Sequence, residues 1–169
     1  MATKTQTIDQ IQVMKRGDPL PDPMVKDGAR MEFLQSRSGA TITVFERMTK
    51  DEYAEFNDGN EGHRSYLVAG IPNGNIGGSE FHPTAKEVLF VLKGSMDWRL
   101  EDLDGNKRTL QLQESNLVFY IPPLTLHQYV STSEGTTLLV QRSAHLVDTF
   151  YEDKFRELQA QHNALTKRS

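Results

Sequence analysis

The chain has 169 residues, a formal net charge of -4 and no cysteine. Its length is that of one ordinary domain, and the absence of cysteine excludes disulfides, thiolate nucleophiles and zinc-thiolate sites. An acidic chain without a dense Lys/Arg stripe is not expected to bind nucleic acid. No apolar run approaches the ~20 residues of a membrane span and residues 1–15 lack the apolar core of a signal peptide, so we expect a cytoplasmic protein without membrane contact.

The first 28 residues are polar and carry prolines at alternate positions, Pro19, Pro21 and Pro23. This spacing favours an extended polyproline-like conformation, and proline cannot donate a hydrogen bond in the interior of a sheet. Residues 1–28 are therefore expected to form an extended N-terminal arm or edge segment. Such an arm can add a strand to a neighbouring subunit.

Short runs rich in Val, Ile, Leu, Phe and Tyr, separated by Gly, Pro, Asn and Asp, follow from residue 31 to residue 142. Runs of this length and composition are typical of β-strands. We expect strands at 31–36, 40–47, 63–69, 76–82, 87–93, 95–101, 107–113, 117–121, 127–131 and 136–142. So many closely spaced strands predict an all-β sandwich or barrel over residues 29–147. Within it, Trp98 alternates with polar neighbours and is expected in the core.

The last segment, residues 148–169, has the pattern of an amphipathic helix packed outside the barrel. Thr149 and Glu152 match a capping box, which predicts that the helix begins there. Apolar residues recur after it at helical spacing. They are Tyr151, Phe155, Leu158 and Leu165.

Four residues able to transfer protons or bind metal fall at the ends of the expected strands. Glu80 and His82 are two apart on one strand and share a face. Glu87 opens the next strand, and His127 begins a later one. A closed barrel brings such strand ends together, so we expect these four side chains to converge.

The spacing of these residues resembles the motifs of the cupin superfamily, the first of which reads G-x5-H-x-H-x(3,4)-E-x6-G. Four of its positions are occupied here by Gly74, His82, Glu87 and Gly94. Glu80 stands at the first histidine position, and Pro122 and His127 match the second motif. The resemblance implies a single-domain jelly-roll β-barrel.

Residues 40–158 are more narrowly similar to the sugar-nucleotide 3,4-ketoisomerases, which convert a 4-keto-6-deoxy sugar on dTDP to its 3-keto isomer. The run Ile121-Pro-Pro-Leu-Thr-Leu-His127 carries this resemblance most clearly, with further matches at 63–66, 77–82, 103–105 and 148–155. That family has His-Ala-His where this chain has Glu80-Phe81-His82. It commonly has Gln at the position of Glu87 and Lys at that of Pro83.

The resemblance and the residue chemistry together predict an isomerase of sugar-nucleotide or related secondary metabolism, acting by proton transfer on a small keto-sugar substrate. Glu80 and His82 are the expected acid and base, with no cofactor. Arg64 and Tyr66, two apart on one strand, and also His127, are candidates for substrate contacts. We expect a homodimer, because barrels of this superfamily often pair.

Two alternatives remain open on the same residues. Two histidines with carboxylates suit one divalent transition metal, Fe, Mn, Ni or Zn, which would make the protein a metal-dependent oxygenase, isomerase or hydrolase. The candidate ligands are Glu80, His82, Glu87 and His127. The second alternative is a non-catalytic, ligand-binding cupin, since a fold does not determine a function.

Overall fold

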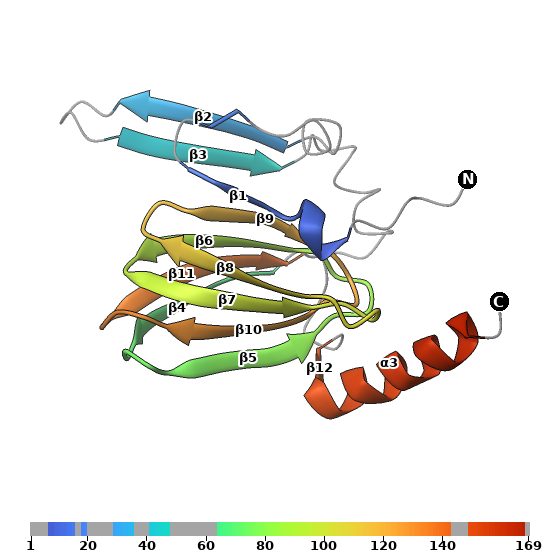
Figure 1. Cartoon of the computed structure of the whole chain (residues 1–169). Helices are drawn as coiled ribbons and strands as arrows, with labels where there is room; N and C mark the ends of the chain where they lie inside the picture. Colours follow the sequence, from blue (N-terminus) through green and yellow to red (C-terminus); the bar gives the residue numbers. More distant parts are fainter. Residues whose placement is uncertain are drawn as a thin grey trace. The chain divides into compact units, whose positions relative to one another are not determined.

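The computed structural model describes residues 7–15, 18–19, 29–35, 41–47, 64–142 and 149–167 (Figure 1). They belong to two compact parts, which are described separately. Met1–Lys15 and His63–Ser169 form one part, and Arg16–Gly62 forms the other. Two of the three arm prolines, Pro21 and Pro23, lie outside the described residues.

The larger part consists of two antiparallel sheets, as the predicted all-β fold requires (Figure 1). The first sheet has the order β1 (Gln12–Met14), β9 (Leu117–Ile121), β6 (Glu87–Lys93), β11 (Thr136–Arg142) and β4 (Arg64–Ile71). The second has the order β12 (Phe150–Tyr151), β5 (Ile76–Phe81), β10 (Leu126–Ser131), β7 (Ser95–Glu101) and β8 (Lys107–Gln113). Their inner faces supply the core, which includes Trp98 as expected.

The smaller part contains β2 (Ala29–Gln35) and β3 (Thr41–Arg47), which pair with each other in a two-stranded antiparallel sheet. Both were expected as strands, within two residues of these bounds. Alternating apolar patterns identify a strand but do not specify its partner, so the sequence did not separate this pair from the other strands. The predicted boundaries at residues 28 and 147 stay a prediction.

The N-terminal residues 7–15 form an edge of the first sheet. A short 3₁₀ helix, η1 (Ile8–Gln10), precedes β1, which pairs antiparallel with β9 of the same chain. Ile8 and Ile11 are buried in the core. One guanidinium nitrogen of Arg108, Nη1, donates to the carbonyl oxygens of Ile8, Asp9 and Ile11 at 2.7, 3.0 and 2.7 Å. Residues 7–15 of the expected arm therefore end in an edge strand, which pairing with β9, the two buried isoleucines and Arg108 fix to the sheet.

The C-terminal helix α3 (Glu152–Thr166) docks on the second sheet through its one fully buried residue, Phe155. The Phe155 ring meets that of Phe81 edge-on, with centroids 5.5 Å apart, and Leu126 belongs to the same apolar cluster. No helix within the described residues is long and apolar enough to cross a membrane.

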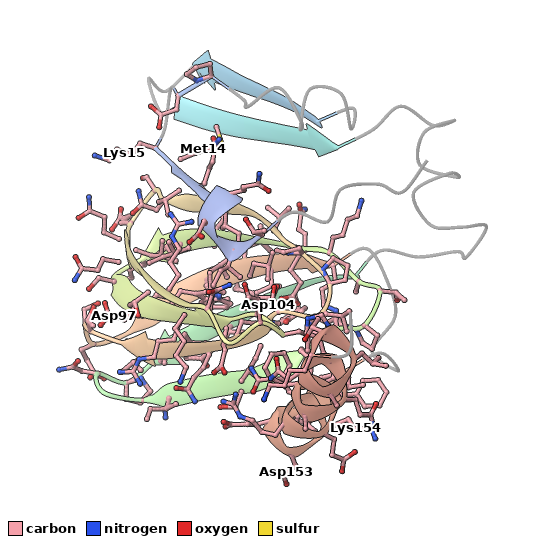
Figure 2. The ribbon with its side chains drawn as sticks, turned by 45° about the vertical axis from the view of Figure 1, so that its right-hand side comes forward. Met14, Lys15, Asp97, Asp104, Asp153 and Lys154 are labelled. Atoms are coloured by element: carbon pink, nitrogen blue, oxygen red, sulfur yellow. The ribbon has the colours of Figure 1, made fainter. Side chains whose placement is uncertain are left out.

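Polar contacts hold the same helix to the end of β7. Arg156 donates from both terminal nitrogens to the two carboxylate oxygens of Glu101, and Gln159 Nε2 donates to one of them at 3.1 Å. His162 Nε2 lies 2.7 Å from the Oδ1 atom of Asp104, a residue that Figure 2 labels beside the helix. The helix is thus fixed along several turns.

The predicted capping box is wrong, because the helix begins after Tyr151 and not at Thr149. Phe150 and Tyr151 pair with β5 as the short strand β12, so the backbone stays extended through Tyr151. The Thr149 hydroxyl instead accepts a hydrogen bond from Arg142 Nη1 at 2.9 Å. Pairing with the sheet has overridden the local capping signal.

Candidate active site

A β-bulge in β5 determines where Glu80 points. In the pairing of β5 with β10, His127 faces Glu80 but Gln128 faces Gly78, so Ser79 is an extra residue in the strand. Gly78 and Ser79 have φ angles of 82° and 62°, and a non-glycine residue in this left-handed region is strained. Gln128 Nε2 donates to Ser79 Oγ at 2.6 Å. Bulges of this kind re-aim side chains beside functional sites.

The structure brings the four candidate side chains together around Glu87. Its Oε1 atom lies 3.0 Å from His82 Nε2, and its Oε2 atom lies 3.1 Å from His127 Nε2. Glu80 Oε1 is 3.9 Å from the same His127 nitrogen. The two imidazole centroids are 5.2 Å apart. One carboxylate therefore bridges both imidazoles, and the second lies beside them.

Electrostatics favour the ionised form of this bridge. Burial alone would raise the pKa of Glu87, but the charge and hydrogen bonds of His127 and His82 lower it well below its usual range. Burial would lower the pKa of His127, whereas Glu87 raises it above its ordinary value. His127 Nδ1 donates to the Thr125 carbonyl at 3.0 Å, which fixes the orientation of the ring. An ionised Glu87 accepts hydrogen bonds from imidazole N–H groups on both sides.

Exposure distinguishes Glu80 from its neighbours. The side chains of Glu87 and His127 are 3% exposed and that of His82 is 2% exposed, whereas Glu80 is 22% exposed. Glu80 is thus the member of the group that a molecule entering from solvent meets first.

An aromatic row backs His127. The Trp98 ring stacks on the His127 imidazole at 5.8 Å and on the Tyr129 ring at 5.9 Å, with interplanar angles of 11° and 23°. Burial and the nearby charge of Glu80 raise the pKa of Tyr129. The sequence placed Trp98 in the core but did not reveal its contact with the site. Trp98 lies on β7, whereas His127 and Tyr129 lie on β10, so their stacking depends on the register between these two strands. The sequence pattern does not specify that register.

Arg142 is a buried charged residue that the sequence analysis missed. It ends β11 directly opposite Glu87, the first residue of β6, and its Nε atom lies 3.7 Å from Glu87 Oε1. The alternation of Leu138, Val140 and Arg142 was an available signal, because residues two apart share the inner face of a strand.

The two expected substrate contacts on β4 lie on the strand next to β11, which carries Arg142. Arg64 opens β4 opposite Arg142, and its side chain lies outside the described residues. Tyr66 is half-buried and packs against the main core cluster. Contact of either residue with a substrate stays a prediction.

The donor set also meets the chemical requirements of a divalent transition metal. One potential ligand atom from each of Glu80, His82 and His127 lies within 4.8 Å of the other two. Two imidazoles with carboxylates suit Fe, Mn, Ni or Zn. However, the Nε2 atoms of His82 and His127 face Glu87, so an ion would have to replace these hydrogen bonds. The residue types therefore suit a metal ion, but its binding would break the contacts of Glu87 with both imidazoles.

Several solved structures share this fold. A 3,4-ketoisomerase from Helicobacter canadensis has 15% sequence identity and a TM-score of 0.60, over 89% of this chain and 97% of its own. A TDP-fucose-3,4-ketoisomerase from Campylobacter jejuni has 15% identity and a TM-score of 0.61, over 88% and 95%. QdtA, a sugar 3,4-ketoisomerase from Thermoanaerobacterium thermosaccharolyticum in complex with TDP, has 18% identity and a TM-score of 0.58, over 89% and 98%. These similarities establish a common fold.

A search of curated proteins finds no match to this chain. The family model described as WxcM-like, C-terminal (FdtA) matches residues 29–161, which include both sheets' central strands and all four residues of the site. The chain therefore belongs to the WxcM-like, C-terminal (FdtA) family.

Proposed function

We propose that this protein is an isomerase that moves the carbonyl group of a nucleotide-linked keto sugar to the neighbouring carbon. The observation that carries the proposal is the partly exposed carboxylate of Glu80 beside two buried imidazoles, with one reactive atom of each within 4.8 Å. The names of its structural neighbours, sugar 3,4-ketoisomerases, support the substrate class.

The proposed reaction is a pair of proton transfers through an enediol. Glu80 removes the proton from the hydroxyl-bearing carbon next to the carbonyl, and the carbonyl oxygen takes up a proton from its acid partner. The enediol then receives a proton on the former carbonyl carbon while the other hydroxyl loses its proton. Bonds and charges balance without an oxidant. His82 is the proposed partner of Glu80, since both groups reach the same point.

The other two residues orient the acid and base. Glu87 accepts from His82 Nε2 and faces His127 Nε2, and so holds both rings in place. His127, backed by Trp98 and bonded to the Thr125 carbonyl, presents a cationic ring beside Glu80. A positive charge there stabilises the negative charge that develops on the enediolate oxygen.

Incubation with TDP-4-keto-6-deoxyglucose, a compound bound by a related ketoisomerase, tests this proposal. Nuclear magnetic resonance is expected to detect the 3-keto isomer, and Glu80→Gln should abolish its formation while preserving the fold. Tight TDP binding without any turnover would contradict an isomerase and favour a non-catalytic, ligand-binding protein.

A metal-dependent enzyme is the second candidate, favoured by the clustering of Glu80, His82 and His127. These residues would hold the ion, which would supply Lewis-acid chemistry to a bound carbonyl. Elemental analysis of protein purified without chelators separates the two candidates. A stoichiometric transition metal that is lost in His127→Ala would favour the second; metal-free protein that is fully active would favour the first.

We also propose a homodimer formed through the outer face of the first sheet. Leu67, Leu139 and Phe90 are direct register partners across β4, β11 and β6, and they form an uncharged row. Leu67 is 57% exposed and Leu92, on the same strand as Phe90, is 40% exposed. Exposed leucines beside half-buried apolar neighbours on one sheet face are typical of association sites. The cytoplasmic setting expected from the sequence stays a prediction.

A further inference from the structure

We propose that Arg142 is a positioning residue of the site: its guanidinium holds the Glu87 carboxylate in the orientation that gives each oxygen one imidazole. The kinetic consequence rests on the proposed function, but the structural one does not. Arg142 contacts Glu87, which in turn contacts both imidazoles, and we place its effect on the site in that contact.

The first step of the argument is the register of the two strands. Arg142 and Glu87 are directly paired residues of β11 and β6, so their side chains emerge on the same face. Both residues are 2% exposed. Arg142 Nε lies 3.7 Å from Glu87 Oε1, the oxygen that His82 also contacts at 3.0 Å. The guanidinium therefore faces the same side of the carboxylate as His82.

The second step is charge. Glu80 and Glu87 place two carboxylates beside one imidazole, at 3.9 and 3.1 Å from His127 Nε2. A buried carboxylate also carries a large desolvation cost unless a cation and hydrogen bonds offset it. The guanidinium of Arg142 adds a positive charge on the Oε1 side of Glu87, beside the imidazoles of His82 and His127.

The third step is the connection beyond Glu87. Arg142 Nη1 donates to Thr149 Oγ1 at 2.9 Å, and Thr149 immediately precedes β12. In β12, Tyr151 is the register partner of Glu80. One guanidinium thus connects Glu87, which orients the imidazoles, with the segment that borders the partly exposed carboxylate of Glu80. A residue with a purely local packing role would not need both contacts.

An unfolding experiment tests the structural arm without reference to activity. We would compare Arg142→Met, Glu87→Gln and the double variant by denaturant titration. Each single change breaks the ion pair and leaves the remaining buried charge less well compensated, so the loss of stability in the double variant is expected to be clearly smaller than the sum of the two single losses. Additive losses would overturn the pairing.

Arg108→Met is the matched control. Arg108 belongs to the same part of the molecule, and its contacts are three carbonyl groups of residues 8–11. Arg108→Met should lower the free energy of unfolding, and its loss should add to that of Glu87→Gln. The kinetics should stay unchanged.

Two readouts separate positioning from folding. For Arg142→Met we expect kcat to fall about 100-fold with KM nearly unchanged, because misplaced acid and base groups reduce turnover more than binding. Arg142→Lys should restore part of the loss. Wild-type values in a folded Arg142→Met variant would overturn the proposal.

If Arg142→Met does not fold, the imidazole N–H protons of Arg142→Lys supply the decisive signal. Hydrogen bonds to Glu87 are expected to shift these resonances downfield in the wild-type protein. The lysine variant should move or broaden them, whereas Arg108→Met should not. Unchanged resonances would overturn the role of Arg142. A wild-type protein that fails to isomerise the sugar nucleotide would refute the proposed function. The unfolding experiment and the imidazole resonances would then still test whether Arg142 positions Glu87.

Discussion

Glu80 and Glu87 are the same residue type with different environments, and the backbone produces the difference. Glu87 opens a central strand and is enclosed by His82, His127 and Arg142. Glu80 follows a bulge near the edge of the second sheet and stays partly exposed. Two carboxylates held in unlike surroundings can take unlike roles, one as a fixed charge and the other as a proton carrier.

Gly77 is required by the aromatic row. A Cβ atom at this position would lie 2.2 Å from the Cζ and hydroxyl oxygen of Tyr129, so Gly77→Ala must displace that ring. We expect a loss of about 1–3 kcal/mol in the free energy of unfolding, typical of overpacking. Denaturant titration measures it. In a Tyr129→Ala background the same substitution should cost much less; an equal cost in both backgrounds would exclude the clash as its cause.

Among the secondary-structure elements, α3 depends most visibly on charge. Its Arg156 binds both carboxylate oxygens of Glu101 at the end of β7, and Glu152 on the helix contacts the same guanidinium at 2.8 Å. Hydrogen bonds from Arg156 lower the pKa of Glu101 below its ordinary 4.5. The docking contact is therefore stronger with Glu101 ionised.

This pKa shift predicts how α3 responds to acid. Because the folded-state pKa of Glu101 is depressed, its contribution is complete above about pH 4.5 and is lost as the pH falls through the lower, folded-state value. Amide exchange in α3 should rise in that acidic range. Glu101→Gln should raise exchange already at neutral pH and flatten the pH response. If amide exchange in α3 of Glu101→Gln rises with acid as in the wild-type protein, a group other than Glu101 causes the rise.

The strands themselves were largely predictable, and the failures have physical causes. Five strands have the predicted bounds because turn residues delimit their apolar runs on both sides. The strands β1 and β12 have three and two residues, too few for an alternating pattern to be recognised. The capping signal at Thr149 failed since the pairing of Phe150 and Tyr151 with β5 takes precedence.

The candidate site was predictable as a set of residues but not as a network. The motif spacing identified Glu80, His82, Glu87 and His127 as candidates. Their convergence was predictable because all four lie at the ends of expected strands. The bridging role of Glu87, and the presence of Arg142 beside it, depend on pairings between strands distant in sequence. Local patterns do not contain that information.

At the scale of the whole molecule, the proposed dimer gives a direct prediction. Leu67→Glu places a charge in the uncharged row of β4, β11 and β6, and burial of an unpaired charge in an interface is unfavourable. Light scattering coupled to size exclusion should find a wild-type dimer and a Leu67→Glu monomer. Leu165→Glu, at a leucine on α3 that is 68% exposed against 57% for Leu67, should remain dimeric. A monomeric wild-type protein would contradict this interface.

The measurement that most directly tests the central claim is solvent-proton exchange into the sugar by wild-type and Glu80→Gln protein. In deuterium oxide, the wild-type protein should place deuterium on the former carbonyl carbon of the 3-keto product made from TDP-4-keto-6-deoxyglucose. Glu80→Gln, folded but without its exposed carboxylate, should incorporate none above the uncatalysed rate. Incorporation by Glu80→Gln at the wild-type rate would contradict the account, as would its absence in both proteins.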